Sequence, residues 1–211
     1  MIKLLVFDFD GTLADSRKEI IKILNETFKK FNCKIPAEKI KRELGNKTLQ
    51  KTLWSCRIES GKISKVISYS NALEVIRADK IKLSLSVKKL NKIKIKKIIM
   101  TNNTQKFAEA VLAKNKIKFF AKIYGAESFR DKASKLTSIL KSGKIKPSQV
   151  VYVGDKRADI TLARKVKCIS VILVSSASWS PKKEILKAKP DFVISNLSQL
   201  SGLIKKLNSS A

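Results

Sequence analysis

Short apolar runs alternate with amphipathic stretches along most of the chain. The apolar runs contain many β-branched residues and stop at glycine or polar residues, as buried strands of a parallel sheet do. Strands are therefore expected at residues 2–7, 94–100, 122–125, 149–153, 168–174 and 191–194. Apolar side chains at helical spacing predict helices at residues 105–113, 132–140 and 159–165. This alternation predicts an α/β fold with a parallel sheet and right-handed crossovers.

Residues 16–80 break the alternation, because helical patterns follow one another there without a strand between them. Ser16 is a good helix N-cap, and Glu19 three residues later completes a predicted capping box. Apolar residues then recur at helical spacing from Ile20 to Phe31. Further helices are expected at residues 37–44, 48–55 and 71–77.

The pattern divides the chain into two parts. Residues 1–15 and 81–211 hold all the expected strands and form the predicted core. Residues 16–80 form a small α-helical insertion after the first strand. We expect the hinges of this insertion near residues 14–16 and 79–85.

The charge of the chain is strongly unbalanced, with 46 Lys and Arg against 17 Asp and Glu and a formal net charge of +29. The surplus is nearly all lysine and is spread along the chain, which favours a solvated basic surface. A surface that recruits nucleic acid or an acidic protein is the alternative. Histidine is absent, which excludes Ser-His-Asp and Cys-His catalysis and histidine-ligated zinc sites. Acid–base chemistry must then come from carboxylates, Lys, Cys or Tyr.

The cysteines and the hydropathy of the chain bear on its location. Cys33, Cys56 and Cys168 are far apart and include no CxxC pair, which argues against a disulfide framework. No signal peptide is visible, and no run approaches the roughly 20 apolar residues of a transmembrane helix. We therefore expect a cytoplasmic protein without a membrane partner.

Acidic residues are scarce, yet five of the 17 gather in two short segments that each follow an apolar strand. One segment holds Asp8, Asp10 and Asp15, and the other holds Asp155 and Asp159. Carboxylates that crowd together at strand ends repel one another and lose hydration, so they need a divalent cation or a cationic side chain. Such hard oxygen ligands suit Mg²⁺, and the carboxyl ends of parallel strands are where ligands bind.

Four segments of the chain carry a family resemblance. LLVFDFDGTLAD resembles the first signature motif of the haloacid dehalogenase-like hydrolases, in particular of their phosphatases. IIMTNN is similar to the second motif, Lys132 in DKASKL to the third, and VVYVGDKRAD to the fourth. The resemblance implies a Rossmann-like core with strand order 5-4-1-2-3, and it identifies the 16–80 insertion with a C1-type helical cap.

The resemblance also implies roles for the acidic residues. Asp8 would be the nucleophile that forms an aspartyl-phosphate, and Asp10 would be the general acid and then the general base. Asp8, the backbone carbonyl of Asp10, and Asp155 would hold Mg²⁺. Asp159 completes this metal group and would support the metal's water ligands or Lys132.

Residues for binding the phosphoryl group follow in the same way. Thr101 and Asn102 would donate hydrogen bonds to the phosphoryl oxygens. Lys132 would neutralise charge in the transition state, and Lys135, one helical turn away, is the alternative lysine. The resemblance therefore predicts a catalytic set with one lysine and one threonine beside the two aspartates.

Four other residues near these motifs are expected to be structural. Trp54 and Trp179 are more typical of a core than of a site. Lys156 and Arg157 lie within the fourth motif but are expected to face solvent.

The predicted function is that of a Mg²⁺-dependent phosphatase acting on a small phosphorylated metabolite, with phosphoglycolate as the default substrate. A phosphomutase or a nucleotide phosphatase on the same core is one alternative. A basic, nucleic-acid-associated binding protein on a hydrolase scaffold is another. The sequence does not define the oligomeric state.

Overall fold

The computed structural model describes residues 1–36, 39–40, 43 and 48–209. Its central sheet has the strand order β5-β4-β1-β6-β7-β8, and every neighbouring pair is parallel. The strands are β1 (Leu4–Phe7), β4 (Lys96–Met100), β5 (Lys122–Tyr124), β6 (Val150–Gly154), β7 (Ile169–Leu173) and β8 (Phe192–Ile194). The predicted α/β fold is confirmed. The expected strand order is confirmed as well, with the sixth strand added beyond the fifth.

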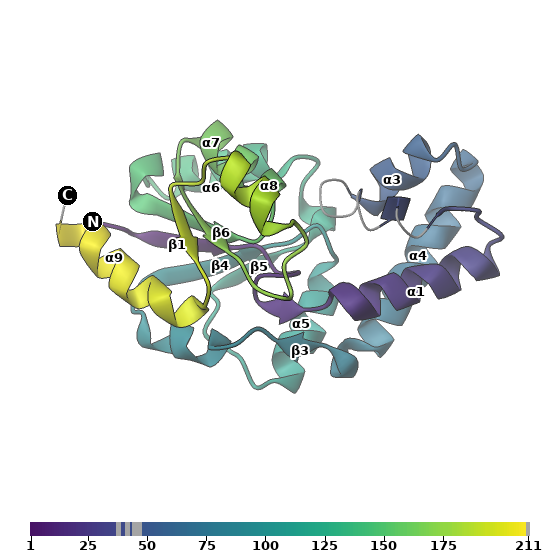
Figure 1. Cartoon of the computed structure of the whole chain (residues 1–211), viewed down its shortest axis with the longest axis horizontal. Coiled ribbons are helices and arrows are strands. Elements are labelled where there is room, and N and C mark those ends of the chain that lie inside the picture. Colours follow the sequence, from purple (N-terminus) through teal and green to yellow (C-terminus); the bar gives the residue numbers. More distant parts are fainter. Residues whose placement is uncertain (37–38, 41–42, 44–47, 210–211) are drawn as a thin grey trace.

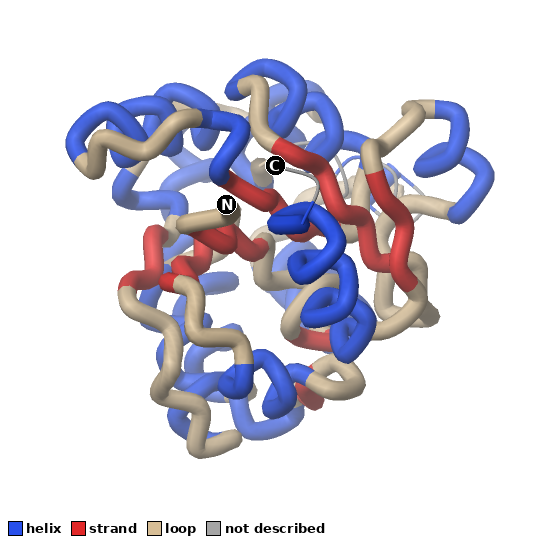
Figure 2. Tube along the Cα trace, turned by 90° about the vertical axis from the view of Figure 1, so that its left-hand side faces the viewer, coloured by secondary structure: helices blue, strands red, loops and turns tan. Residues whose placement is uncertain are grey.

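Helices cover both faces of the sheet, which is why its central strands are apolar on both sides (Figures 1 and 2). Successive residues of a strand point to opposite faces, so Leu5 and Phe7 pack with α5 and α9, whereas Leu4 and Val6 pack with α6 and α7. The covering helices are α5 (Gln105–Lys114), α9 (Leu200–Ser209), α6 (Lys132–Ser142) and α7 (Arg157–Val166). The short helix α8 (Lys182–Lys187) packs through Ile185 against β7 and α7.

The inserted segment forms a separate helical layer beside the sheet, on the right of Figure 1. Its described helices are α1 (Arg17–Lys30), α3 (Leu49–Ser55) and α4 (Ser60–Ile76). Their apolar faces form a cluster of their own, which includes Leu24, Leu53 and Val66. This independent core supports our assignment of residues 16–80 to a cap.

The two connections of the cap run side by side. β2 (Ala14–Asp15) pairs antiparallel with β3 (Lys82–Leu83), and the amide of Ser84 donates to the carbonyl of Leu13. Arg17, at the start of α1, reaches the core and donates through its guanidinium to the carbonyls of Ser176 and Ser178. The cap is therefore tied to the core at its entry and exit.

Several helical predictions need correction or extension. The capping box at Ser16 was a wrong prediction, because the Ser16 hydroxyl does not cap α1 but donates to Asp10. α4 begins eleven residues before the predicted start at residue 71, since Gly61 and the serines of its first turns have weak helix propensity and hid the pattern. α8 and α9 were not predicted. Most of the predicted helix at residues 37–44 lies outside the described residues.

None of the helices in the described part of the chain is long and apolar enough to cross a membrane.

The N-terminus of α6 gives a first testable prediction, because Asp131 caps the helix that carries Lys132. Its Oδ2 accepts hydrogen bonds from the amide and the hydroxyl of Ser134, at 2.9 and 2.7 Å. These bonds lower the pKa of Asp131 to about 2. We expect Asp131→Ala to reduce the free energy of unfolding by about 1 kcal/mol at neutral pH, measured by urea denaturation.

The pH dependence of this difference follows from the sign of the pKa shift. The folded pKa is lower than the ordinary value of 3.8, so the ionised side chain stabilises the fold above that pH, and the stabilisation is lost as the pH falls towards about 2. Glu59 is the matched control, because it stands at the N-cap of α4 without a side-chain capping bond. A Glu59→Ala loss as large as that of Asp131→Ala would contradict the capping account.

Candidate active site

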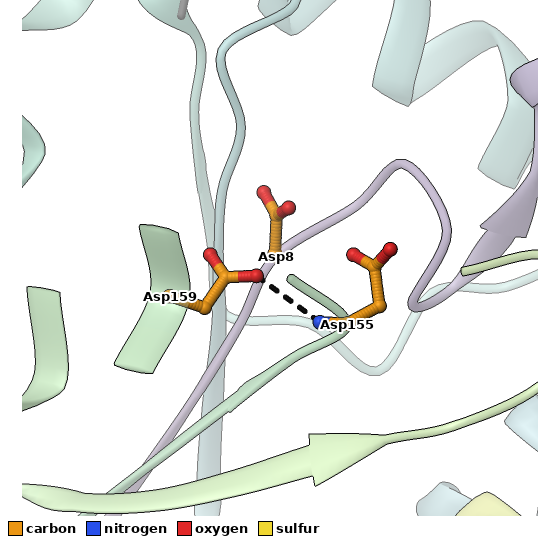
Figure 3. A group of neighbouring side chains, drawn as sticks. All are labelled: Asp8, Asp155 and Asp159. Atoms are coloured by element: carbon orange, nitrogen blue, oxygen red, sulfur yellow. Dashed lines mark hydrogen bonds between the residues drawn. The ribbon is translucent and has the colours of Figure 1, made fainter. Parts of the chain in front are cut away.

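Three aspartates meet where two neighbouring strands end. Asp8 directly follows β1 and Asp155 directly follows β6, and the parallel register of Phe7 with Val153 places both at the same edge of the sheet. Asp159 joins them from the first turn of α7 (Figure 3). One carboxylate oxygen from each of the three lies within 4.8 Å of the others, and all three residues are buried.

This acidic group can hold a metal ion. Burial raises the pKa of Asp155 well above its ordinary value, and it raises the pKa of Asp159 to about 6 with repulsion from Asp8 as the next cause. Buried carboxylates that repel one another are stabilised when a cation binds between them. Oxygen donors from a few carboxylates are the protein ligands that Mg²⁺ prefers, so the residues fit the predicted ion.

Asp8 lies between two ammonium groups. Lys132 Nζ donates to its Oδ1 at 2.7 Å, and Lys156 Nζ donates to its Oδ2 at 2.6 Å. Burial alone would raise the pKa of Asp8, but the two lysine charges outweigh burial and lower it to about 2. Asp8 is therefore ionised at neutral pH, as a nucleophile must be.

Asp10 has a different environment although it is only two residues further along. Ser16 Oγ donates to its Oδ1 at 2.6 Å, and Thr101 Oγ1 donates to its Oδ2 at 3.3 Å. Burial raises the pKa of Asp10; the hydrogen bond from Ser16 offsets part of the rise, and the charge of Asp8 adds to it. Two nearby carboxyl groups whose pKa values move in opposite directions are suited to different roles, one as an ionised nucleophile and one as a proton donor.

The turn after Asp10 depends on a glycine. Gly11 has a φ of +81°, in the left-handed region, and a Cβ there would overlap the carboxylate of Asp155. Thr12 Oγ1, in the same turn, donates to Asp155 Oδ1 at 3.2 Å, and the amide of Trp179 donates to Asp155 Oδ2 at 2.6 Å. The turn of the first motif therefore holds Asp155, the candidate metal ligand of the fourth motif, in place.

Asp159 is fixed by backbone hydrogen bonds. Its Oδ2 accepts from the amides of Asp155 and Lys156, at 3.1 and 3.2 Å. Gly154 lets the carboxylate approach the strand end, because a Cβ at that position would collide with it. The residue therefore caps the start of α7 and also faces the acidic group.

The second motif lies at the end of β4, beside β1. Thr101 is buried, and besides donating to Asp10 its Oγ1 accepts from the amide of Asn103 at 3.0 Å. Asn102 is half-buried and lines the cleft between cap and core. Thr101 is therefore close to the proposed acid, while Asn102 is placed at the cleft wall.

Of the basic residues near the motifs, only Lys156 lies elsewhere than expected. Lys132, on α6, contacts Asp8, whereas Lys135 lies with its Nζ 5.3 Å from the centre of the Tyr124 ring. Lys156 was expected to face solvent, but it is buried and paired with Asp8, because the strand-end turn aims its side chain back over the acidic group. Arg157 is exposed as expected.

A cleft lies between the cap and the core. Among the described residues, its walls come from α1, α3 and α4 of the cap and from the strand-end loops of the core. Its polar and aromatic lining includes Asp10, Asn71, Glu74, Asn102, Lys156 and Trp179. The expectation that both tryptophans are core residues was wrong: Trp179 lines this cleft as well as packing on the cap, and Trp54 is 59% exposed.

Three residues of the site were missed from the sequence. Lys156 could have been found from its place directly after Asp155, which puts it at the same strand end. Ser16 was interpreted as a helix cap. Glu74 gave no signal, because a single glutamate within a helix is usually solvated.

Comparison with known proteins agrees with this geometry. Over 89 residues, the chain is 28% identical to a phosphoglycolate phosphatase of Vibrio vulnificus. The match covers 41% of this chain and 38% of that relative, so the chain spans well under two thirds of the relative's length.

Solved structures match over nearly the whole chain. A haloacid dehalogenase-like hydrolase of Streptococcus pneumoniae superposes with a TM-score of 0.80 at 21% identity and covers 96% of this chain and 98% of its own. CbbY of Rhodobacter sphaeroides, solved in complex with phosphate, gives a TM-score of 0.80 at 17% identity, with 95% and 96% covered. At such identities the likeness shows the fold.

The family itself is shown by a sequence model. The model of the haloacid dehalogenase-like hydrolases matches residues 5–174, which contain both parts of the acidic group and all of the four motifs except Leu4, the first residue of the first motif. The resemblance drawn from the motifs is thereby confirmed. The chain belongs to the haloacid dehalogenase-like hydrolase family.

Proposed function

We propose that the chain is a Mg²⁺-dependent phosphatase that hydrolyses a small phosphomonoester through an aspartyl-phosphate on Asp8. The observation that carries the proposal is the contrast between Asp8 and Asp10. One carboxyl is kept ionised by two lysines, and the other has a raised pKa. Both lie at one strand end beside a group of acids that can hold a metal ion.

The first half of the reaction transfers the phosphoryl group to Asp8. A carboxylate oxygen of Asp8 attacks phosphorus, the bond from phosphorus to the ester oxygen breaks, and Asp10 gives its proton to that oxygen. Lys132, together with Thr101 and Asn102, stabilises the negative charge on the phosphoryl oxygens. When bound, Mg²⁺ supplies further charge neutralisation for the phosphoryl group and for the acidic group.

The second half returns the enzyme to its starting state. Asp10, now ionised, accepts a proton from a water molecule that attacks phosphorus. The bond between phosphorus and Asp8 breaks, which releases inorganic phosphate and restores the Asp8 carboxylate. The alcohol from the first half leaves through the cleft, which the cap shields from bulk water.

Hydrolysis of 4-nitrophenyl phosphate tests this function. We expect Mg²⁺-dependent release of nitrophenolate and inorganic phosphate, lost in EDTA and restored by added Mg²⁺. Phosphoglycolate is the first natural ester to test, because the relative from Vibrio vulnificus is named a phosphoglycolate phosphatase. An isomeric sugar phosphate formed without phosphate release would point to a phosphomutase. A salt-sensitive complex with nucleic acid and no hydrolysis would favour the binding protein.

Lys156 makes a further prediction about metal binding. Its ammonium contacts Asp8 at 2.6 Å, and the attraction of Asp8 and two neighbouring carboxylates raises its pKa in spite of burial, so it remains charged. A cation beside the acidic group opposes the binding of another. We expect Lys156→Ala to lower the Kd for Mg²⁺ about tenfold, measured by isothermal titration calorimetry.

The control for this variant removes the same charge elsewhere. Lys187 is exposed on α8, and Lys187→Ala should leave the Kd for Mg²⁺ unchanged. Weaker Mg²⁺ binding by Lys156→Ala would mean that the lysine supports the metal site, which would contradict the prediction.

A further inference from the structure

One acceptor atom in the cleft has no partner. Glu74, on cap helix α4, is only 5% exposed, and its side chain lines the cleft together with Asp10 and Lys156 of the core. Ser70 Oγ donates to its Oε1 at 3.2 Å, and the side chain of Asn103 approaches the carboxylate and lowers its pKa. Its Oε2 nevertheless has no donor within 3.5 Å among the residues that the structure describes. A buried carboxylate oxygen without a donor is costly, so this atom is suited to a donor brought by a ligand.

Glu74 lies on the leaving-group side of the site. Glu74 and Asp10 line the same cleft, one from the cap and one from the core. Burial raises the pKa of Glu74 to about 7, and repulsion from Asp10 is the next cause. In the proposed reaction Asp10 gives its proton to the oxygen of the leaving alcohol. A side chain that faces Asp10 from the cap therefore faces the alcohol rather than the phosphoryl group.

The cleft also has a donor without a partner. Trp179 Nε1 is buried and has no acceptor within the described ranges, and the side chain lines the same cleft. An indole N–H can only donate, and the free oxygen of an ionised Glu74 can only accept. A hydroxyl group both donates and accepts, so a ligand with hydroxyl groups satisfies both atoms.

We infer that Glu74 is a specificity residue that accepts a hydrogen bond from a hydroxyl group of the leaving alcohol, so that the preferred substrates are hydroxylated phosphomonoesters, such as polyol phosphates. The inference rests on the proposed phosphatase function and narrows its substrate class. Above pH 7, where Glu74 is ionised, it separates this chain from an enzyme for phosphoglycolate, because the carboxylate of that substrate would meet the carboxylate of Glu74. Two buried carboxylates cannot both stay ionised at close range without a cation between them.

The inference is tested with small esters that differ at one position. Glycerol 3-phosphate and propyl phosphate differ only in their hydroxyl groups, and phosphoglycolate differs from ethyl phosphate in its carboxylate. For the wild type we expect kcat/KM to be about tenfold higher for glycerol 3-phosphate than for propyl phosphate, which is the effect of one hydrogen bond to a charged group.

Two substitutions of Glu74 separate hydrogen bonding from charge. Glu74→Met removes the acceptor and should bring the ratio of glycerol 3-phosphate to propyl phosphate close to one, mainly through KM. Glu74→Gln removes the negative charge and should raise kcat/KM for phosphoglycolate about tenfold relative to ethyl phosphate. Glu26→Gln is the matched control, because it removes a cap carboxylate that pairs with Arg77 and does not line the cleft.

The outcomes distinguish this inference from the proposed function. If 4-nitrophenyl phosphate is hydrolysed but the ratios are the same in wild type and Glu74→Met, the Glu74 inference is overturned and the phosphatase stands. If no ester is hydrolysed, the phosphatase proposal fails, and calorimetric binding of the same esters with Mg²⁺ tests Glu74 alone. Tighter binding of glycerol 3-phosphate than of propyl phosphate, lost in Glu74→Met, supports it. Equal or absent binding overturns it.

Discussion

Asp8→Asn is expected to lower kcat for 4-nitrophenyl phosphate by at least about 10⁴-fold, because the amide cannot accept the phosphoryl group. The substitution keeps the shape of the side chain, although its single amide oxygen can accept from only one of Lys132 and Lys156. The measurement is steady-state release of nitrophenolate with saturating Mg²⁺.

A structural effect of the same substitution has to be excluded. Circular dichroism and thermal melting should show that Asp8→Asn is folded at the assay temperature. Glu26→Gln, in the cap, should keep wild-type turnover. Turnover of folded Asp8→Asn within tenfold of the wild type would show that the phosphoryl group does not pass through this residue.

Asp10→Asn is expected to have a large effect that depends on the leaving group. An amide cannot protonate the leaving oxygen or activate water, and such acid–base catalysis is worth about 10²–10⁴-fold. Nitrophenolate leaves readily without protonation, whereas an alkoxide does not. We therefore expect a loss near the upper end of this range for glycerol 3-phosphate and a smaller loss in the first half-reaction with 4-nitrophenyl phosphate, measured by stopped flow.

The dependence on the leaving group is the feature that a merely structural role would not reproduce. A distorted site would slow both esters by a similar factor. Equal losses for the two esters would thus refute the assignment of Asp10 as the acid. The contacts with Ser16 and Thr101 should persist in Asp10→Asn, since the amide oxygen can accept from one hydroxyl and the NH2 group can donate to the other.

The sequence was sufficient to predict the core because its signals are local. Each central strand is apolar on both faces, and each ends at a residue that cannot continue the pattern, as Phe7 gives way to Asp8. Once the strands are parallel, the acids at their ends must share one edge of the sheet. The proximity of Asp8 and Asp155 follows once β1 and β6 are also neighbours, as the strand order implied by the resemblance makes them, and α7 adds Asp159 from its first turn.

The roles of three residues were not predicted, because they depend on where each side chain points in the folded structure. Ser16 has every local feature of a helix cap, yet its hydroxyl donates to Asp10, because the cap connection brings the two side chains together. Lys156 is one of many lysines, and only the turn after β6 aims it at Asp8. Glu74 reaches the site from a separate layer, so no spacing along the chain relates it to Asp10.

The division into core and cap stays a prediction with a clear physical basis. Residues 16–80 have their own apolar cluster, and their two connections pair as β2 and β3.

The surplus lysine charge also stays a prediction, with a solvated basic surface as its first interpretation and a surface that binds nucleic acid as the alternative.

The most direct test of the account is detection of the phosphorylated enzyme. Asp10→Asn should be mixed with 4-nitrophenyl phosphate and Mg²⁺, quenched in acid, and digested for mass spectrometry. Because water activation is lost, the account predicts that a phosphoryl group accumulates on the peptide that contains Asp8, and that its site is Asp8 itself. Release of phosphate over many turnovers without phosphorylation of Asp8 at any time point, or phosphorylation at another residue, would contradict it.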